Sequence, residues 1–332
     1  MKRRKKPFII LAVILVVVLL VAGYIKFFNG RLIYFTTGMK SGELIKTAGQ
    51  KTTYTCEADI LMSDVKKEYE EMFGSNIWRE KIGDADFESY IKDQIKSKLM
   101  RVKAMNVKAK ERGVVLGREE KDSVGKAVDA FYNELTESQI SSTGITKDKL
   151  NTMFTEFAIA QKLYDDLTSS MDIEVSADEA RVIDIQYIVS DSEEDINKAY
   201  NLVNSGSSFF AVAKEYNADG EYEYELKRSE MDAAFEKAAF NMSTGEMSSI
   251  VEAAGRYYII RCTSDNDKAK TEVNKSAILE KRKLEQFNAD FEKYESGIYM
   301  EFNNSEWKKL SIQDAYTLES GFEDTFNAYF GK

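Results

Sequence analysis

The sequence contains no histidine, a single proline (Pro7) and two cysteines, Cys56 and Cys262. The lack of histidine removes the imidazole ligands on which many metal sites depend, and the cysteines show no CxxC spacing for zinc or redox chemistry. Because Pro7 is the only proline, the chain after it has no X-Pro bond to slow its own folding. The two cysteines cannot be paired from sequence alone, and we expect isolated, partly buried thiols on strands. We therefore predict no metal and no cofactor.

Basic residues are outnumbered by acidic ones. The 332 residues include 46 Lys and Arg against 56 Asp and Glu, which gives a formal net charge of −10. A strongly basic face is the usual requirement for binding nucleic acid, so DNA and RNA are excluded as partners. The length is enough for about two domains, each with its own core.

The first residues have a different character from the rest. A basic cluster at 2–6 precedes an apolar run over 8–25. This pattern predicts a transmembrane anchor or signal peptide over 1–28, with the basic end on the cytoplasmic side and the remainder outside the cell membrane. Small residues at Val21 and Gly23 leave cleavage as an alternative to a retained, single-pass anchor. A buried core helix is the remaining interpretation.

The part that follows divides into a linker and a helical domain. Residues 29–54 lack a clear period and are predicted to be a linker, and 52–58 alternates like a short strand. From Ser63 onward, apolar residues recur at every third or fourth position, which is typical of helices that bury one face. The expected helices cover 63–73, 86–112, 118–135 and 146–171. We therefore predict a helical domain over 55–175.

A capping-box spacing from Ser176 to Glu179 marks the start of a domain with mixed periodicity. We predict a β-α-α-α-β order around a small sheet over 176–264. Its expected elements are a strand at 182–189, helices at 193–204, 208–216 and 231–240, and a closing strand at 256–262. The helical period returns after 267, and an aromatic tail follows it, so 265–332 are expected to pack on the helical domain. The predicted fold class is α+β.

Three segments of the mixed domain carry a family resemblance. IQYIV at 185–189 is similar to the opening strand of parvulin domains, GSSFFAVAKEYN at 206–217 to a helix of that family, and MDAAFEKAAFNMSTGEMS at 231–248 to its pocket segment. Together with the flanking helices, they make the chain resemble the PrsA/SurA group of extracytoplasmic foldases. The resemblance implies a chaperone lobe built from both chain ends around an inserted parvulin (rotamase) domain.

The resemblance also implies site residues. Met231 and Phe235 match the residues that hold the proline ring, and Leu226 falls near the pocket aromatic of the family. Asp219 lies where parvulins place a Cys or Asp, and the two family histidines correspond to Tyr187 and Tyr258. The implied catalytic residues are thus Tyr187, Asp219 and Tyr258, and the implied substrate-binding residues are Leu226, Met231 and Phe235.

Each of these residues also has an ordinary structural interpretation. Tyr187 and Tyr258 could simply fill one face of a sheet, because aromatic residues favour strands. The spacing of four between Met231 and Phe235 also suits packing of a helix on a core. Asp219 precedes Gly220 and could serve as a turn residue.

Three functions are compatible with this sequence. The first is a membrane-anchored foldase for unfolded or proline-containing secreted polypeptides, with a parvulin-type peptidyl-prolyl isomerase domain. The second is a non-catalytic holdase or peptide-binding module. The third is a structural subunit of an envelope complex, suggested by the aromatic tail that begins at Trp307. The sequence leaves open whether the chain forms a homodimer.

Overall fold

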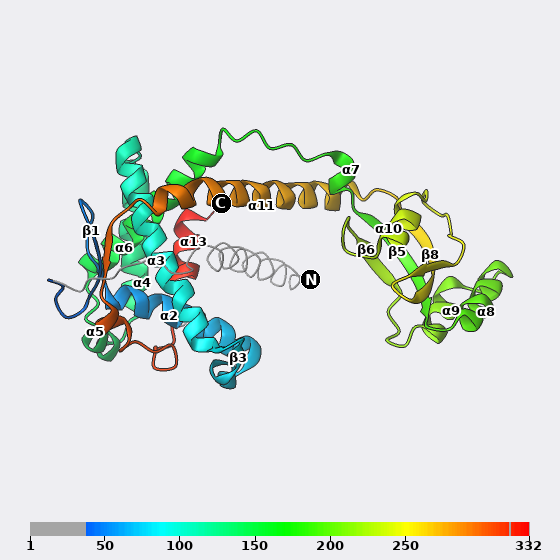
Figure 1. Cartoon of the computed structure of the whole chain (residues 1–332), viewed down its shortest axis with the longest axis horizontal. Helices are drawn as coiled ribbons and strands as arrows, with labels where there is room; N and C mark the ends of the chain where they lie inside the picture. The colour runs from blue at the N-terminus through cyan, green and yellow to red at the C-terminus, as the bar shows by residue number, and fades with distance from the viewer. Residues whose placement is uncertain (1–37, 319, 332) are drawn as a thin grey trace. The chain divides into compact units, whose positions relative to one another are not determined.

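The computed structural model describes residues 38–318 and 320–331 (Figure 1). The anchor predicted over 1–28 lies outside these residues. Of the helices in the described part of the chain, none combines the length and the apolar character needed to span a bilayer. The chain divides into two compact units: unit 1 contains residues up to 171 and from 285 onward, and unit 2 contains 172–284.

Unit 1 is mainly helical. Its helices are α2 Thr55–Phe73, η1 Ser75–Arg79, α3 Phe87–Arg112, α4 Arg118–Glu134, α5 Glu137–Thr143, α6 Lys147–Thr168, α12 Asn304–Trp307 and α13 Phe322–Phe330. Its strands are β1 Glu43–Thr47, β2 Thr53–Tyr54, β3 Lys81–Ile82, β4 Ala85–Asp86 and β9 Met300–Phe302. Strands β2, β1 and β9 form one small antiparallel sheet, and β3 and β4 form a hairpin.

The long helices begin and end where the sequence predicts. The carboxylate of Asp86 accepts a hydrogen bond from the Ser89 N–H at the start of α3, and Thr146 does the same for α6. Gly113 ends α3 in the left-handed conformation, with φ of 72°. The predictions for α3, α4 and α6 are therefore confirmed, whereas α5 was not predicted.

The start of α2 contradicts two predictions. Residues 52–58 were expected to form a strand and Ser63 to open the helix, but the helix begins at Thr55. The reason is local, because the Glu57 carboxylate accepts the Tyr54 N–H at 2.9 Å and caps the first turn. Cys56 consequently lies on a helix and not on a strand, although both cysteines are free and buried as expected.

Unit 1 joins segments that are far apart in the sequence. The predicted linker over 29–54 contains β1, whose Leu44 and Ile45 are fully buried and which pairs with β9 in the register Ile45↔Phe302. The linker prediction was therefore wrong from Glu43 onward. Phe322 of α13 is buried against the helices of this unit, whereas residues 265–284, which were also expected to pack on the helical domain, belong to unit 2.

Unit 2 is an antiparallel sheet covered by helices. Its strands are β5 Ile183–Ser190, β6 Glu223–Leu226, β7 Val251–Ala253 and β8 Arg256–Ser264, and its helices are α7 Ala177–Ala180, α8 Glu193–Asn204, α9 Phe209–Tyr216 and α10 Ala233–Phe240. Helix α11 Lys268–Glu295 starts here, and its last turns belong to unit 1. The strand order is β6-β5-β8-β7. The predicted strands and helices are present, and β6 and β7 are additional. The chain is thus α+β, as predicted.

Each face of the sheet has its own apolar cluster. Alternating residues of β5 and β8 point to opposite faces, as the pleat requires. On one face Ile185 and Ile260 pack with Phe235 of α10. On the other face Ile188 and Ile259 pack against α8 and α9. The sheet is therefore the middle of three layers (Figure 1).

Candidate active site

Two tyrosines lie on the α10 face of the sheet. Tyr187 on β5 is directly opposite Ile260, and Tyr258 on β8 is opposite Val189. This register makes the tyrosines diagonal neighbours on one face, which is within reach of long side chains. Tyr258 is largely buried and Tyr187 is half-buried. The sheet therefore brings together the two residues predicted to replace the histidine pair.

The predicted proline-binding residues lie on the same face. Leu226 on β6, Phe235 on α10 and Tyr258 are packed in one cluster, with Met231 at its margin. Leu226 is fully buried and Phe235 is 1% exposed, whereas Met231 is half-buried. The edge of the Tyr258 ring meets Phe235 at a centroid distance of 5.0 Å and an interplanar angle of 80°. Tyr258 and Phe235 are thus packed together inside the cluster, and Met231 is the more accessible of the predicted binding residues.

Asp219 is at the edge of this cluster. Its side chain is exposed, and its Oδ1 accepts the Glu221 N–H at 3.0 Å across a turn in which Gly220 has φ of 71°. The negative charge of this carboxylate also affects the pKa of Tyr187. Burial, and next the negative charges of Asp219 and Glu221, raise the pKa of Tyr187. Tyr187 is therefore protonated at neutral pH and can donate a hydrogen bond.

Asn217 was not predicted as a site residue, yet it connects this region. Its Oδ1 accepts the Val189 N–H at 2.9 Å, and its Nδ2 donates to the carbonyls of Tyr187 at 3.1 Å and Glu221 at 2.5 Å. It is 4% exposed. Its place at the end of the 206–217 segment was the only available signal in the sequence. Asn217 therefore fixes the backbone of β5 to the turn that carries Asp219.

A second unpredicted group lies at the start of β8. Arg256 Nε donates to Asp191 at 2.6 Å, and this bond, with a smaller contribution from the Tyr258 hydroxyl, raises the pKa of Arg256. The Tyr258 hydroxyl is therefore held beside a permanent positive charge. Arg256 and Asp191 are exposed, so the pair lies at the surface next to the buried ring.

Replacing Asn217 with alanine is expected to destabilise the connection between β5 and the turn that carries Asp219. The change leaves the buried Val189 N–H and two carbonyls without their partner, which should cost about 2 kcal/mol. Hydrogen exchange at the Val189 N–H should become faster accordingly. Asn204→Ala, at an exposed position of α8, is the matched control and should leave that exchange unchanged. Equal exchange in the two variants would contradict the bridging role of Asn217.

The sequence around this site is similar to that of known proteins. Residues 189–264 match the family of PPIC-type PPIASE domains, the rotamases. This part of unit 2 is therefore similar to a rotamase domain. The chain as a whole is similar to the foldase protein PrsA of Caldanaerobacter subterraneus subsp. tengcongensis, with 24% identity over 240 residues, 67% of this chain and 73% of that protein. The resemblance predicted from the sequence is therefore confirmed.

Two further relatives differ in how much of the chain they match. The foldase protein PrsA of Bacillus subtilis is 36% identical over 89 residues, which are 24% of this chain and 30% of that protein. A crystal structure of the peptidylprolyl isomerase PrsA from Bacillus cereus covers 88% of this chain and 100% of its own, at 17% identity and a TM-score of 0.36. Similarity to PrsA foldase proteins therefore extends over 67% of this chain, whereas the match to the rotamase family covers residues 189–264.

The partly buried residues at this cluster include both apolar and hydrogen-bonding side chains. Met231 is the accessible apolar contact, and the hydroxyl of Tyr187 is a donor close to it in the same cluster. Phe235 is 1% exposed, so it can contact a ligand only if the side chains packed around it, Tyr258 among them, move. The arrangement can hold a small apolar ring and present hydrogen-bond donors to a nearby carbonyl, without any nucleophile.

Proposed function

We propose that the protein is an extracytoplasmic foldase that binds unfolded secreted polypeptides and isomerises X-Pro bonds at a histidine-free site in its rotamase domain. The observation that carries the proposal is the clustering of Tyr187, Met231, Phe235 and Tyr258 on one face of a rotamase-type sheet. Leu226 is a fully buried member of the same cluster. The negative charge of Asp219 helps to raise the pKa of Tyr187.

The chemistry required of such a site is modest. The barrier to rotation about the peptide bond is about 18–20 kcal/mol, and the transition state is a twisted amide with reduced conjugation. A site accelerates the rotation if it binds this twisted form more tightly than either planar isomer. Met231 supplies an apolar contact for the proline ring, and the protonated Tyr187 hydroxyl is placed to donate to a carbonyl of the substrate. No covalent intermediate is involved.

The proposal is tested by proline-limited refolding of a standard substrate protein, with the chain from Arg31 onward as the catalyst. Met231→Ala should reduce the acceleration about tenfold, because the accessible contact to the proline ring is lost. Tyr187→Phe keeps the ring and removes only the hydroxyl, and it should slow catalysis without unfolding unit 2. Met247→Ala, on the opposite face of the sheet, is the control. If the unmodified chain gives no acceleration, the isomerase proposal fails.

Burial of the predicted pocket favours a second candidate, a non-catalytic holdase. Leu226 and Phe235 are almost fully buried, and Tyr258 packs against Phe235. While these side chains stay buried, a proline ring cannot contact Phe235. A holdase would suppress aggregation of an unfolded client without accelerating proline-limited refolding, and Met231→Ala would not change that suppression. The same refolding experiment, run beside an aggregation assay, separates the two candidates.

The location of the protein is part of the proposal. The basic cluster and apolar run over 1–28 support a single-pass anchor that leaves the foldase outside the cell membrane. The similarity to PrsA foldases supports polypeptide clients. The domain limits predicted from the sequence, with a rotamase-like domain over 176–264 between two parts of a helical lobe, remain our proposal for how the chain is organised.

A further inference from the structure

The outer edge of the rotamase sheet is formed by β6. This strand pairs only with β5, in the register Asp184↔Glu225 and Gln186↔Glu223. The Tyr187 N–H donates to the carbonyl of Tyr222, just before β6, at 2.9 Å. In an antiparallel pair every second residue bonds to the neighbouring strand, so the backbone groups of Tyr224 and Leu226 face β5. The backbone N–H and C=O groups of Glu223 and Glu225 consequently point away from the sheet. They form an open edge to which another strand can be added.

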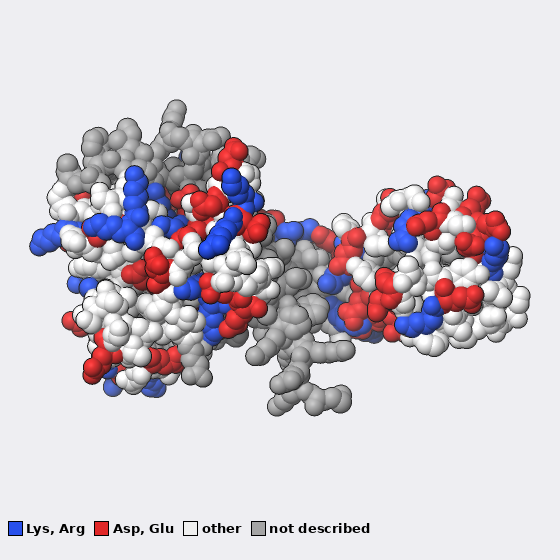
Figure 2. Space-filling view, turned by 90° about the horizontal axis from the view of Figure 1, so that it is seen from below, with Lys and Arg blue, Asp and Glu red and all other residues white. Residues whose placement is uncertain are grey.

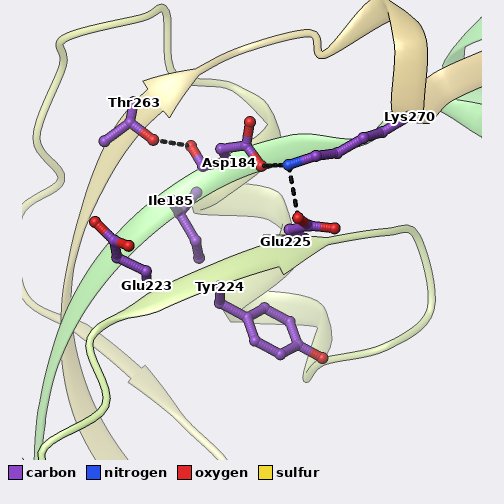
Figure 3. A pocket seen from close by; sticks show the side chains of 7 residues that line it. All are labelled: Asp184, Ile185, Glu223, Tyr224, Glu225, Thr263 and Lys270. Carbon is purple, nitrogen blue, oxygen red and sulfur yellow. Dashed lines mark hydrogen bonds and ion pairs between the residues drawn. The ribbon is translucent and has the colours of Figure 1, made fainter. Parts of the chain in front are cut away.

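A hollow of about 370 Å³ lies next to this edge, lined by residues of β6, β5 and β8 and by Lys270, and its acidic side chains come from β6 and β5 (Figure 3). Glu223 and Glu225 come from β6, and Asp184 comes from β5. Since neighbouring residues of a strand alternate between faces, Tyr224 points to the other side, where it is 40% exposed. A chain bound along β6 would thus meet carboxylates on one face and an aromatic ring on the other.

One lysine at the hollow offsets part of this acidity. Lys270 Nζ lies 2.7 Å from Asp184 and 2.7 Å from Glu225, and 3.4 Å from Asp267. A single ammonium cannot neutralise three carboxylates. Glu223 accepts hydrogen bonds from the Gln186 amide, at 3.2 Å, and from the Tyr222 hydroxyl, and neither donor carries a charge. The edge therefore keeps a surplus of negative charge.

Unit 2 as a whole also carries more negative than positive charge. Residues 172–284 contain 23 Asp and Glu and 14 Lys and Arg, a net charge of −9 out of −10 for the whole chain. In Figure 2, red acidic side chains outnumber blue basic ones over the visible face of this unit. A field of this sign attracts cationic segments and repels anionic ones.

We propose that the β6 edge binds an extended Lys- or Arg-rich segment of a client polypeptide as an added antiparallel or parallel strand. Backbone hydrogen bonds to Glu223 and Glu225 provide the attachment, and their carboxylates select for positive charge. This second binding site is separate from the apolar cluster around Phe235. It rests on the proposed function only in that the client is a polypeptide, and it does not depend on isomerase activity.

Other occupants fit the edge less well. In residues 38–318 and 320–331 there is no group of acidic or cysteine side chains arranged to hold a metal ion. A second copy of this chain would bring its own β6 carboxylates next to these, and like charges across a strand pair are destabilising. A basic, extended segment satisfies both the open backbone groups and the unneutralised carboxylates.

The test is fluorescence anisotropy with the full chain in a non-ionic detergent. The probe is a short labelled peptide of alternating Lys and Val, which can extend along β6. Binding is expected for this peptide and should weaken as salt is raised, because the carboxylates are exposed. A Glu-Val peptide should not bind. The Lys-Val peptide with alternate backbone nitrogens methylated has the same charge but cannot pair fully with a strand, and it should bind less well.

Variants separate charge from backbone pairing. Glu223→Gln with Glu225→Gln should weaken binding about fivefold. Glu252→Gln with Glu193→Gln makes the same change in charge at exposed positions outside β6, on β7 and α8, and should have little effect. Glu225→Pro removes an outward N–H without removing a bond to β5, so it should weaken binding about threefold beyond Glu225→Gln.

Two results would overturn the proposal. One is equal binding of the methylated and unmethylated peptides, which would leave only diffuse electrostatic attraction. The other is equal weakening by the two double variants, which would place the binding elsewhere on the acidic unit. Loss of prolyl isomerisation in Met231→Ala with unchanged peptide binding would leave this proposal intact, so its failure can be distinguished from failure of the proposed function.

Discussion

Lys103→Met is expected to lower the free energy of unfolding of unit 1 by about 3–5 kcal/mol, because it leaves buried carboxylates without their cation. Lys103 on α3 is 1% exposed, and its Nζ lies 2.6 and 2.5 Å from the two carboxylate oxygens of Glu156 on α6. It also donates to the Lys51 carbonyl at 2.7 Å. The only two tryptophans, Trp78 and Trp307, are in unit 1, so tryptophan fluorescence during urea unfolding measures the effect.

The effect of Lys103→Met should depend on pH. Burial raises the pKa of Glu57 to about 8, and burial also raises the pKa of Glu156, although Lys103 lowers both. A carboxyl whose pKa is higher in the folded state stabilises the fold while it is protonated, and this contribution is lost as pH rises toward the folded-state value. Without Lys103 both carboxyls prefer their neutral forms still more strongly. The variant should therefore lose more stability at pH 8 than at pH 5.

Two further variants make the Lys103 result interpretable. Lys121→Met makes the same change on the exposed surface of α4 and should alter stability by less than about 0.5 kcal/mol. Lys103→Met combined with Glu156→Leu removes the ion pair as a whole and should recover much of the loss. If Lys103→Met unfolds at the same urea concentration as Lys121→Met, then the buried pair does not stabilise unit 1.

Phe322→Ala is expected to cost about 3–5 kcal/mol in the same measurement, because it leaves a cavity where α13 joins the helices of unit 1. The Phe322 ring is 1% exposed, and its centroid is 4.6 Å from that of Phe154 and 4.8 Å from that of Phe157. The Phe322 N–H donates to Asp64 at 2.8 Å, a contact that the substitution retains. The loss therefore measures packing of the ring alone.

The control for Phe322→Ala is on the same helix. Tyr329 of α13 is 38% exposed, so Tyr329→Ala removes an aromatic ring without opening a cavity in the core. It should cost less than about 1 kcal/mol. A similar loss in both variants would mean that α13 contributes to stability through its helix alone and not through the buried ring.

Periodicity predicted the long helices well, since residues such as Ile91, Ile95 and Leu99 repeat on one face and are all buried. Lys103 follows on the same helix and is equally buried, which no apolar pattern indicates. Its partner Glu156 is distant in sequence, so the pair becomes visible only when α3 and α6 are packed together. Similarly, β1 was predicted to be linker because its partner β9 lies near the other end of the chain.

The candidate site was predicted in part for the same reason. A resemblance of short segments was enough to gather Tyr187, Met231 and Phe235, which the sheet places in one cluster. It did not indicate that Tyr258 would lie against Phe235, because that depends on packing between β8 and α10. Strand β6 was missed because its alternating Glu and Tyr residues resemble an acidic loop, and only the pairing with β5 makes it a strand.

The pairing of β1 with β9 and the packing of α13 have a consequence for the order in which the protein matures. Unit 1 needs residues from both ends of the chain, whereas unit 2 is a single continuous segment. During synthesis from the amino terminus, unit 2 is complete before the last strand and helix of unit 1 have been made. A chain that stops before β9 therefore contains every residue of unit 2 but lacks a strand and helices that unit 1 requires.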